Sequence, residues 1–542
     1  MKRILLFIII VLSVIGCKKD FADRLPTTSN IVENFYKTPN DALQALTAIY
    51  NMNLRDDWWS SIIVSEIASD NCAGGGGSTD GGGYQLYDRA VQQPDAGGNA
   101  SLYLWKTYYG GIYRANVYLQ SEKNVDWTGK EALRAQYIGE ARFLRAYFHF
   151  YLTRLFGEIP FLDHPLAPNE PIPGRTPAED LYAKIIADLK YSATYCLSQP
   201  YGAMKLDNWG HATKWAAEAM LARVYLFYSG YYNKPDIKGF TAINARDAID
   251  TVYNLSGHVL VDTFASLWIV PAASQHKTYA GEINSEVVWS IRYMSGGGLD
   301  TYQRMVGPRN TNVDPYGQGW GACTVLPTLW RAYDTADLRR YATILDWAGE
   351  GKTYKYVTNT QAQYTGYNLK KYENLSENSK PVFPGSGDWQ TNNAEDFIVI
   401  RFADVLLMGA ELHVITGDNG TTALTYLNKV RTRAFGGDIS HNYATATIDN
   451  IMNERRLELV FEDSRYWDIL RSCKGDFTKL VSILTYHDPN DAANFATDAN
   501  SAETNYLNVD GNNFVDKKGL FQLPQSELDL MKGVIKQNPG YN

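Results

Sequence analysis

Two loop-like stretches combine aromatic rings with polar side chains, as a site that binds a sugar without transforming it requires. They cover residues 80–105 and 292–320. The apolar face of a sugar stacks on Trp or Tyr, while its hydroxyl groups need Asp, Asn, Gln or Arg at the rim. Packing within the loops is the alternative role for each residue. The residues for which we predict ligand contact are Trp320, Tyr84, Tyr87, Tyr293, Tyr302, Arg304, Arg309, Asp80 and Asn99.

The motifs of several common enzyme classes do not occur in the sequence. Gly385-Ser386-Gly387 lacks the spacing of a nucleophile elbow, and no H-E-x-x-H pair is present. The run Gly74–Gly77 is not followed by G-K-[ST], so it is not a phosphate loop. A glycosidase needs only two carboxylates close in space, which sequence does not exclude. We therefore predict a protein that is not an enzyme and that uses no metal and no cofactor.

The charge balance argues against a nucleic-acid partner. The formal net charge is −8, so the chain offers no basic stripe to displace the counterions of a phosphate backbone. The chain also contains 38 Tyr and 13 Trp. We expect most of these rings between packed helices and the remainder at a surface for a planar or sugar-like ligand.

The N-terminus predicts export and lipidation. Basic residues at positions 2 and 3 precede the apolar run Ile4–Ile15, which is typical of a signal peptide and short for a membrane span. The end of this segment, Val14-Ile15-Gly16-Cys17, resembles the lipobox of bacterial lipoproteins, in which Cys17 would become the lipidated N-terminus. Lys18 is not the Asp that retains such proteins at the inner membrane, so we expect the outer membrane. We assign residues 1–16 to the signal peptide and 17–30 to a lipidated tether.

The remaining cysteines are far apart and form no C-x-x-C motif. An exported protein could pair some of them, and buried free thiols are equally consistent with the sequence. The pairing stays open for Cys72, Cys196, Cys323 and Cys473.

The stretch from Glu131 to Pro160 is the helix around which the others must pack. Its apolar residues recur at helical spacing, and Gly157 followed by Pro160 ends it. Around Phe148 the helix is apolar on nearly all sides, so it must lie between other helices.

Other segments predict helices that occur in pairs. Residues 212–229 and 242–255 form one pair, and residues 402–416 and 422–434 form another. The spacing within the first pair is close to the tetratricopeptide period of about 34 residues. Helices are also expected at 39–50, 102–119 and 177–197, and one long helix at 447–472. Trp105 lies on a face of the second of these, so we expect it in the core. In the long helix, Arg455 with Glu458, Arg465 with Asp468 and Asp468 with Arg471 lie at i,i+3, which favours salt-bridged packing for these residues.

The character of the sequence changes between residues 257 and 395. Gly and Pro recur there between short apolar runs, which predicts long loops and short strands. We therefore expect an all-α fold, in which tetratricopeptide-like helix pairs form a scaffold (31–256 and 396–542) and carry a loop-rich insert (257–395).

Together these segments resemble the SusD/RagB family of outer-membrane nutrient-uptake lipoproteins. The lipobox, the length and the order of the motifs agree over nearly the whole mature chain. The matching segments are RAN at 114–116, EARFLRAYFHFYLTRLFGEIP at 140–160, AEAMLARVYLF at 217–227, RFADVLLMGAELH at 401–413, LNKVRTRA at 427–434, ERRLELVFEDSRYWDILR at 454–471, LPQSELDL at 523–530 and QNPGY at 537–541.

The resemblance implies one SusD-like domain over residues 31–542, built on four helix pairs. It also implies a surface lipoprotein that captures oligosaccharides, without catalysis, and delivers them to a TonB-dependent β-barrel of the SusC type. A peptide-capturing member of the family is the first alternative. A lid that gates the barrel with little ligand affinity of its own is the second. The matching motifs belong to the scaffold and leave the cargo open.

Overall fold

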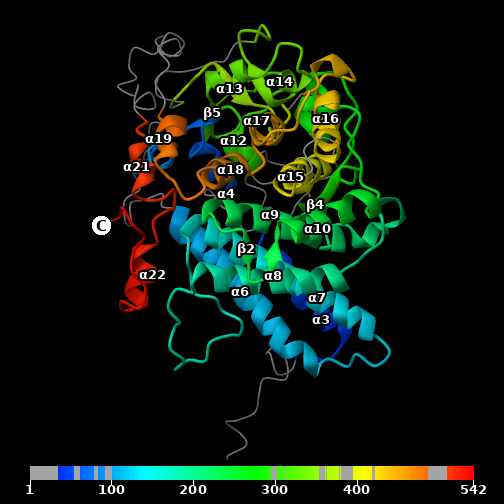
Figure 1. Ribbon diagram of the computed structural model, residues 1–542, viewed down its shortest axis with the longest axis vertical. Helices are drawn as coiled ribbons and strands as arrows, with labels where there is room; N and C mark the ends of the chain where they lie inside the picture. Colours follow the sequence, from blue (N-terminus) through cyan, green and yellow to red (C-terminus); the bar gives the residue numbers. More distant parts are fainter. Residues whose placement is uncertain are drawn as a thin grey trace, which may run out of the picture.

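The computed structural model describes most of the chain (Figure 1). The described residues are 35–53, 61–77, 83–91, 100–293, 302–310, 312–352, 361, 363–376, 379, 395–417, 421–485 and 509–541. One hydrophobic cluster runs through this part of the chain from Tyr36 to Ile535. A smaller cluster within the insert is formed by Val270, Tyr316, Leu345 and Trp347.

The long central helix forms as predicted. Helix α7 (Glu131–Phe156) ends at Gly157, which has a positive φ of 73° that a residue with a side chain rarely adopts. Nearly every residue of α7 after Gly139 is buried. The helix packs against α3 (Pro39–Tyr50), α6 (Ala100–Ser121) and α8 (Ala178–Tyr195). Gly111 of α6 allows this approach, because a side chain there would collide with the ring of Phe148.

The two predicted helix pairs are confirmed and adjoin each other. The first consists of α9 (Lys214–Tyr231) and α10 (Ala242–Leu255), and the second of α15 (Phe402–Ile415) and α16 (Thr422–Ala434). Helix α9 packs against α8, and α10 packs against α15, so neighbouring helices continue from α6 to α16. The fold is therefore all-α with tetratricopeptide-like pairs, as the sequence predicts.

Short strands link the insert to the scaffold. Strand β4 (Val287–Ile291) pairs with β8 (Phe397–Arg401), and β1 (Cys72–Gly74) pairs with β5 (Cys323–Val325). The other two-stranded antiparallel sheets are β2 (Asp236–Ile237) with β3 (Phe240–Thr241), and β6 (Ile344–Asp346) with β7 (Tyr367–Leu369).

The insert also contains short helices. They are α11 (Ile269–Ser274), α12 (Tyr302–Val306), α13 (Pro327–Ala332) and α14 (Leu338–Thr343). Helices α13 and α14 lie at the top of Figure 1, at the end opposite α3 and α7. Five further short helices lie near the two ends of the described chain. They are α4 (Ser61–Ile67), α5 (Gln85–Asp88), α19 (Lys479–Leu484), α21 (Asn512–Val515) and α22 (Gln525–Leu530).

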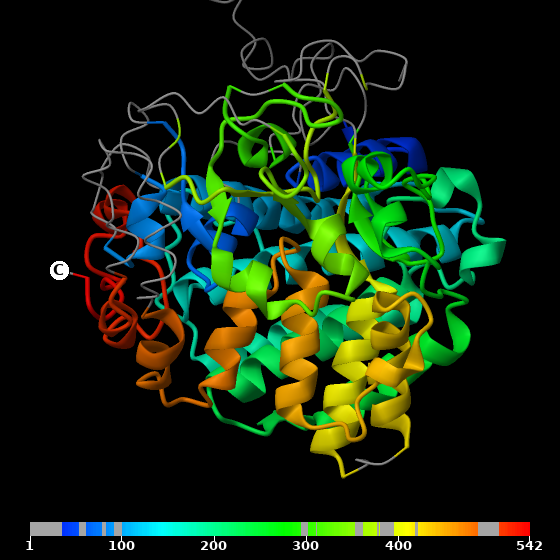
Figure 2. The same ribbon diagram turned by 90° about the horizontal axis from the view of Figure 1, so that it is seen from above.

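The prediction of one long helix at 447–472 is wrong. The chain forms α17 (Ile448–Leu459) and α18 (Arg465–Ser472), joined by a sharp corner (Figure 2). Phe461 and Asp463 in this corner have φ angles of 65° and 55°, outside the helical region. Glu462 accepts hydrogen bonds from Arg401 and Lys371, and Asp463 accepts one from Arg154. These partners lie far away in the sequence, and they hold the corner open against the local helical preference.

The ion pairs of α17 and α18 also differ from the predicted spacing. Of the three i,i+3 pairs that the sequence suggests, only Asp468 with Arg471 forms. Arg455 binds Asp404 and Asp468 instead, and Arg465 binds Asp70. Burial raises the pKa of Asp70, but Arg465 and Arg456 outweigh it and lower that pKa to about 2.

Glu66 on α4 introduces a pH dependence at the same corner. Its side chain is 1% exposed, and burial together with the charge of Asp463 raises its pKa to about 8. The folded state therefore binds a proton that the unfolded chain releases above a pH of about 4.5, so this contribution to stability is lost as the pH rises to about 8. We expect Glu66→Gln to raise Tm at pH 9 and to leave it nearly unchanged at pH 5. A gain at pH 5 equal to that at pH 9 would contradict this origin, and Glu179→Gln, at an exposed position on α8, is the control.

Candidate functional site

The segments next to the two candidate ligand-binding stretches meet in the structure. Strand β1, at the start of the glycine-rich segment, pairs with β5 of the insert in a register that places Cys72 opposite Val325. Beyond β1, the backbone N–H of Gly75 donates to the carbonyl of Ala322 at 2.7 Å, and that of Gly76 donates to the carbonyl of Gly321 at 2.5 Å. The glycine-rich segment thus lies along the backbone that immediately follows Trp320.

Close packing explains why glycines are needed here. A side chain at Gly75 would collide with the carbonyl oxygen of Gly321, and one at Gly77 would collide with the guanidinium of Arg309. Gly321 has a positive φ of 63°, and a side chain there would collide with Gln361. The sequence showed only that this glycine run is not a phosphate loop. Its role in joining the two loops depends on residues nearly 250 positions away, roughly the separation of β1 and β5.

Trp320 is held by arginines of the insert. The guanidinium carbon of Arg304 lies 5.1 Å from the centre of the Trp320 ring, within the range of a cation–π interaction. The Trp320 backbone donates to the carbonyl of Arg304 at 2.7 Å, and Nη1 of Arg309 donates to the carbonyl of Trp320 at 3.0 Å. The indole is half-buried against the core, so part of it reaches the surface in a fixed orientation.

Tyr293 lies beyond the end of β4 and is also half-buried. Its backbone N–H donates to Oδ1 of Asp396 at 2.9 Å, and Nε of the preceding Arg292 donates to Oδ2 at 3.0 Å. Burial raises the pKa of Asp396 to about 6, and Arg292 opposes that rise. Asp396 therefore fixes the backbone that presents Tyr293.

Three of the predicted contact residues belong to the core instead. Tyr84 is 7% exposed, Tyr87 is 1% exposed and Tyr302 is 3% exposed. The ring of Tyr87 packs edge-on against Phe521, and the hydroxyl of Tyr302 donates to the carbonyl of Phe461. A ring covered in this way has no face for a sugar, so we leave these tyrosines out of the proposed site.

Other predictions from the sequence have mixed outcomes. Cys17, Asp80 and Asn99 lie outside the described residues. The expectation that Trp105 is a core residue is confirmed, at 3% exposure. The sequence left the state of the cysteines open, and the structure shows buried free thiols at Cys72, Cys196, Cys323 and Cys473.

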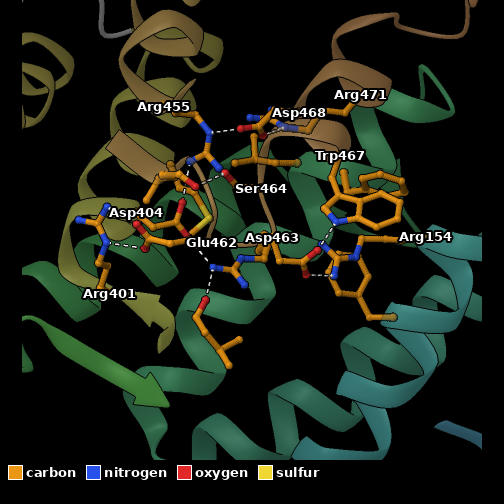
Figure 3. Close-up of a pocket in the computed structure, with 17 residues that line it drawn as sticks. Arg154, Arg401, Asp404, Arg455, Glu462, Asp463, Ser464, Trp467, Asp468 and Arg471 are labelled. Carbon is orange, nitrogen blue, oxygen red and sulfur yellow. Dashed lines mark hydrogen bonds and ion pairs between the residues drawn. The ribbon is translucent and has the colours of Figure 1, made fainter. Parts of the chain in front are cut away.

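A cavity in the scaffold is lined by charged residues of α9, α15, α17 and α18 (Figure 3). Its acids pair with arginines, as in the contact of Arg154 with Asp463 at 2.8 Å. Trp467 also donates its indole N–H to Asp463. Arg455 and Asp468, which the sequence suggested as salt-bridged packing residues, pair at 2.8 Å. The cavity lies apart from Trp320, which is not among its lining residues.

Neither a metal centre nor a membrane-spanning helix is found among the described residues. No group of three or more His, Cys, Asp or Glu side chains in this part of the chain is arranged to hold a metal ion. Within the same residues, no helix has both the length and the hydropathy to cross a bilayer.

Comparisons with known proteins agree over most of the chain. The model of the SusD family matches residues 285–541, and a model described as "Starch-binding associating with outer membrane" matches residues 34–226. SusD-like protein P2 of Formosa agariphila is 25% identical over 553 residues and is aligned over 99% of both chains.

Solved structures share the fold. Surface glycan-binding protein A from Bacteroides fluxus superimposes with a TM-score of 0.74 at 25% identity, over 93% of this chain and 100% of that one. A laminarin-binding SusD-like protein superimposes with a TM-score of 0.70 at 25% identity, over the same shares of the two chains.

Proposed function

Because the chain belongs to the SusD/RagB family, we propose that it is a non-catalytic glycan-binding lipoprotein of the outer membrane. The observation that carries the proposal is the half-buried indole of Trp320, which directly precedes the backbone that the glycine-rich segment contacts. The names of the two similar structures, a surface glycan-binding protein and a laminarin-binding protein, support the ligand class.

The geometry around Trp320 suits an oligosaccharide. The accessible part of the indole offers an apolar surface for the C–H face of a sugar ring. Arg304 and Arg309, which contact Trp320, carry guanidinium groups that can donate hydrogen bonds to hydroxyl oxygens. The site is preorganised, because the backbone of Trp320 is hydrogen-bonded to Arg304 and to Arg309. Little conformational entropy of this residue is therefore lost when a ligand binds.

Delivery requires an anchor and a transporter. In this proposal, acyl chains on Cys17 hold the protein at the outer membrane, facing the cell surface, and residues 17–30 are the tether. The partner is a TonB-dependent β-barrel of the SusC type, which takes up the captured oligosaccharide. Co-purification of a barrel with the lipidated protein tests this part. A mature protein that is unacylated and brings down no barrel would overturn it.

The first experiment is affinity electrophoresis of the protein without residues 1–17 on gels that contain one soluble polysaccharide each, with laminarin and starch among them. The described core begins at Tyr36, so this truncation removes none of it. We expect one polysaccharide to retard the protein. Retardation by none would favour peptide cargo or a gating lid, and hydrolysis of the retarding polysaccharide would favour an enzyme.

Trp320→Ala should weaken binding of the retarding polysaccharide at least tenfold, since loss of an aromatic stacking surface costs about 1.5 kcal/mol or more. Isothermal titration with a soluble oligosaccharide from that polysaccharide measures the change. Tyr113→Ala is the control, because Tyr113 is an exposed aromatic residue of α6. Equal affinity of the wild-type protein and Trp320→Ala would remove the proposed site.

A further inference from the structure

The charged cavity in the scaffold has a volume of about 40 Å³. On this measure a water molecule needs about 10–15 Å³, so the cavity has room for a monatomic anion with water beside it. Arg154 and Trp467 lie on one side of it, and Arg455 and Asp468 lie on another (Figure 3).

The carboxylates around the cavity already have donors. Both oxygens of Asp404 accept hydrogen bonds, from Arg223 and from Arg455. Both oxygens of Asp468 accept as well, from Arg455 and from Arg471. Asp404 and Asp468 are therefore each held by two guanidinium groups, and the other two carboxylates of the wall, Asp463 and Glu462, pair with Arg154 and Arg401.

The arginines, by contrast, keep unused donors. A guanidinium carries five N–H donors and no acceptor. Nε of Arg154 is buried and has no hydrogen-bond partner among the described residues, although this side chain is only 2% exposed. In the same part of the chain, Arg223 donates only through Nη2, and Nη2 of Arg455 makes no hydrogen bond.

The charges around the cavity are nearly balanced, so the unused donors of its arginines decide what it can bind. Its wall contains five arginines and four carboxylates. Glu286, Glu411 and Glu458, which balance Arg401 and Arg471 from behind, do not line it. A buried donor without an acceptor costs free energy, so a group that only accepts hydrogen bonds is the best complement to this wall.

We propose that this cavity binds one small monovalent anion of the halide class, held by Arg154, Arg223 and Arg455. The anion would join α7, α9 and α17, which meet at the cavity, and would stabilise the junction of the two halves of the scaffold. Arg223 is the most exposed of the three, with 18% of its side chain accessible.

Bromide identifies the site directly. Crystals of the protein soaked in sodium bromide should show an anomalous peak in the cavity, within hydrogen-bond distance of the three guanidinium groups. Density without an anomalous signal would mean that the cavity holds water only, and it would overturn the proposal.

Chloride should also stabilise the protein in solution. At constant sodium concentration, replacing gluconate, which is too large for the cavity, by chloride should raise Tm by about 1–3 °C between about 10 mM and 500 mM. We expect Arg223→Gln to lose this dependence and Arg246→Gln, which alters an arginine on the surface of α10, to keep it. A chloride effect that is equal in all three proteins would be a general salt effect and would overturn the proposal. If Arg223→Gln fails to fold, the bromide measurement on the wild-type protein decides.

Discussion

Glu458→Gln should destabilise the protein more than any other single change proposed here. Glu458 is fully buried, and its carboxylate accepts hydrogen bonds from Arg401, Arg433 and Arg339. Burial raises its pKa, but these three arginines outweigh burial and hold that pKa well below the usual range. The charge is therefore retained in the core, and removing it leaves three guanidinium groups without their shared partner. A loss of about 3–5 kcal/mol is expected.

Thermal unfolding followed by circular dichroism measures this loss. The variant should melt several degrees lower than the wild-type protein or fail to accumulate in folded form. Glu179→Gln, which removes an exposed carboxylate from α8, should melt like the wild-type protein. A surface substitution is expected to change Tm by about one degree. If Glu458→Gln changes Tm by no more than that, the network contributes little to stability.

Gly75→Ala should weaken glycan binding strongly, although Gly75 is not one of the residues proposed to contact the glycan. The added methyl group would collide with the carbonyl oxygen of Gly321, and that carbonyl accepts a hydrogen bond from Gly76. The glycine-rich segment must then move away from the backbone that follows Trp320. A displaced indole no longer matches the preorganised site, so we expect Kd to rise at least tenfold, or about 1.4 kcal/mol.

Gly174→Ala is the matched control, because a side chain at Gly174 would meet open space. Isothermal titration with the oligosaccharide from the electrophoresis screen gives the affinities of both variants. A thermal melt of each variant shows whether the scaffold is intact. Unchanged affinity in Gly75→Ala would show that the glycine-rich segment does not position Trp320.

The sequence alone determined most of the long scaffold helices and the two helix pairs. Helices α7 and α10 begin and end where apolar spacing, Gly157 and the segment 242–255 indicate, because helix boundaries depend on side chains only a few residues apart. The order of the motifs was likewise sufficient for the family. The prediction that Trp320 contacts a ligand came from an aromatic ring in a Gly-rich loop, and it stays a prediction.

Tertiary structure decided the details of the site and of its support. The corner between α17 and α18 depends on Arg154 and Lys371, which no local pattern reveals. The burial of Tyr302 depends on Phe461, and the role of Gly75 depends on Gly321. Each of these contacts joins segments at least 91 residues apart. Local spacing predicts which face of a helix is apolar. Only the folded chain shows which aromatic side chains of the loops are buried and which remain accessible to a ligand.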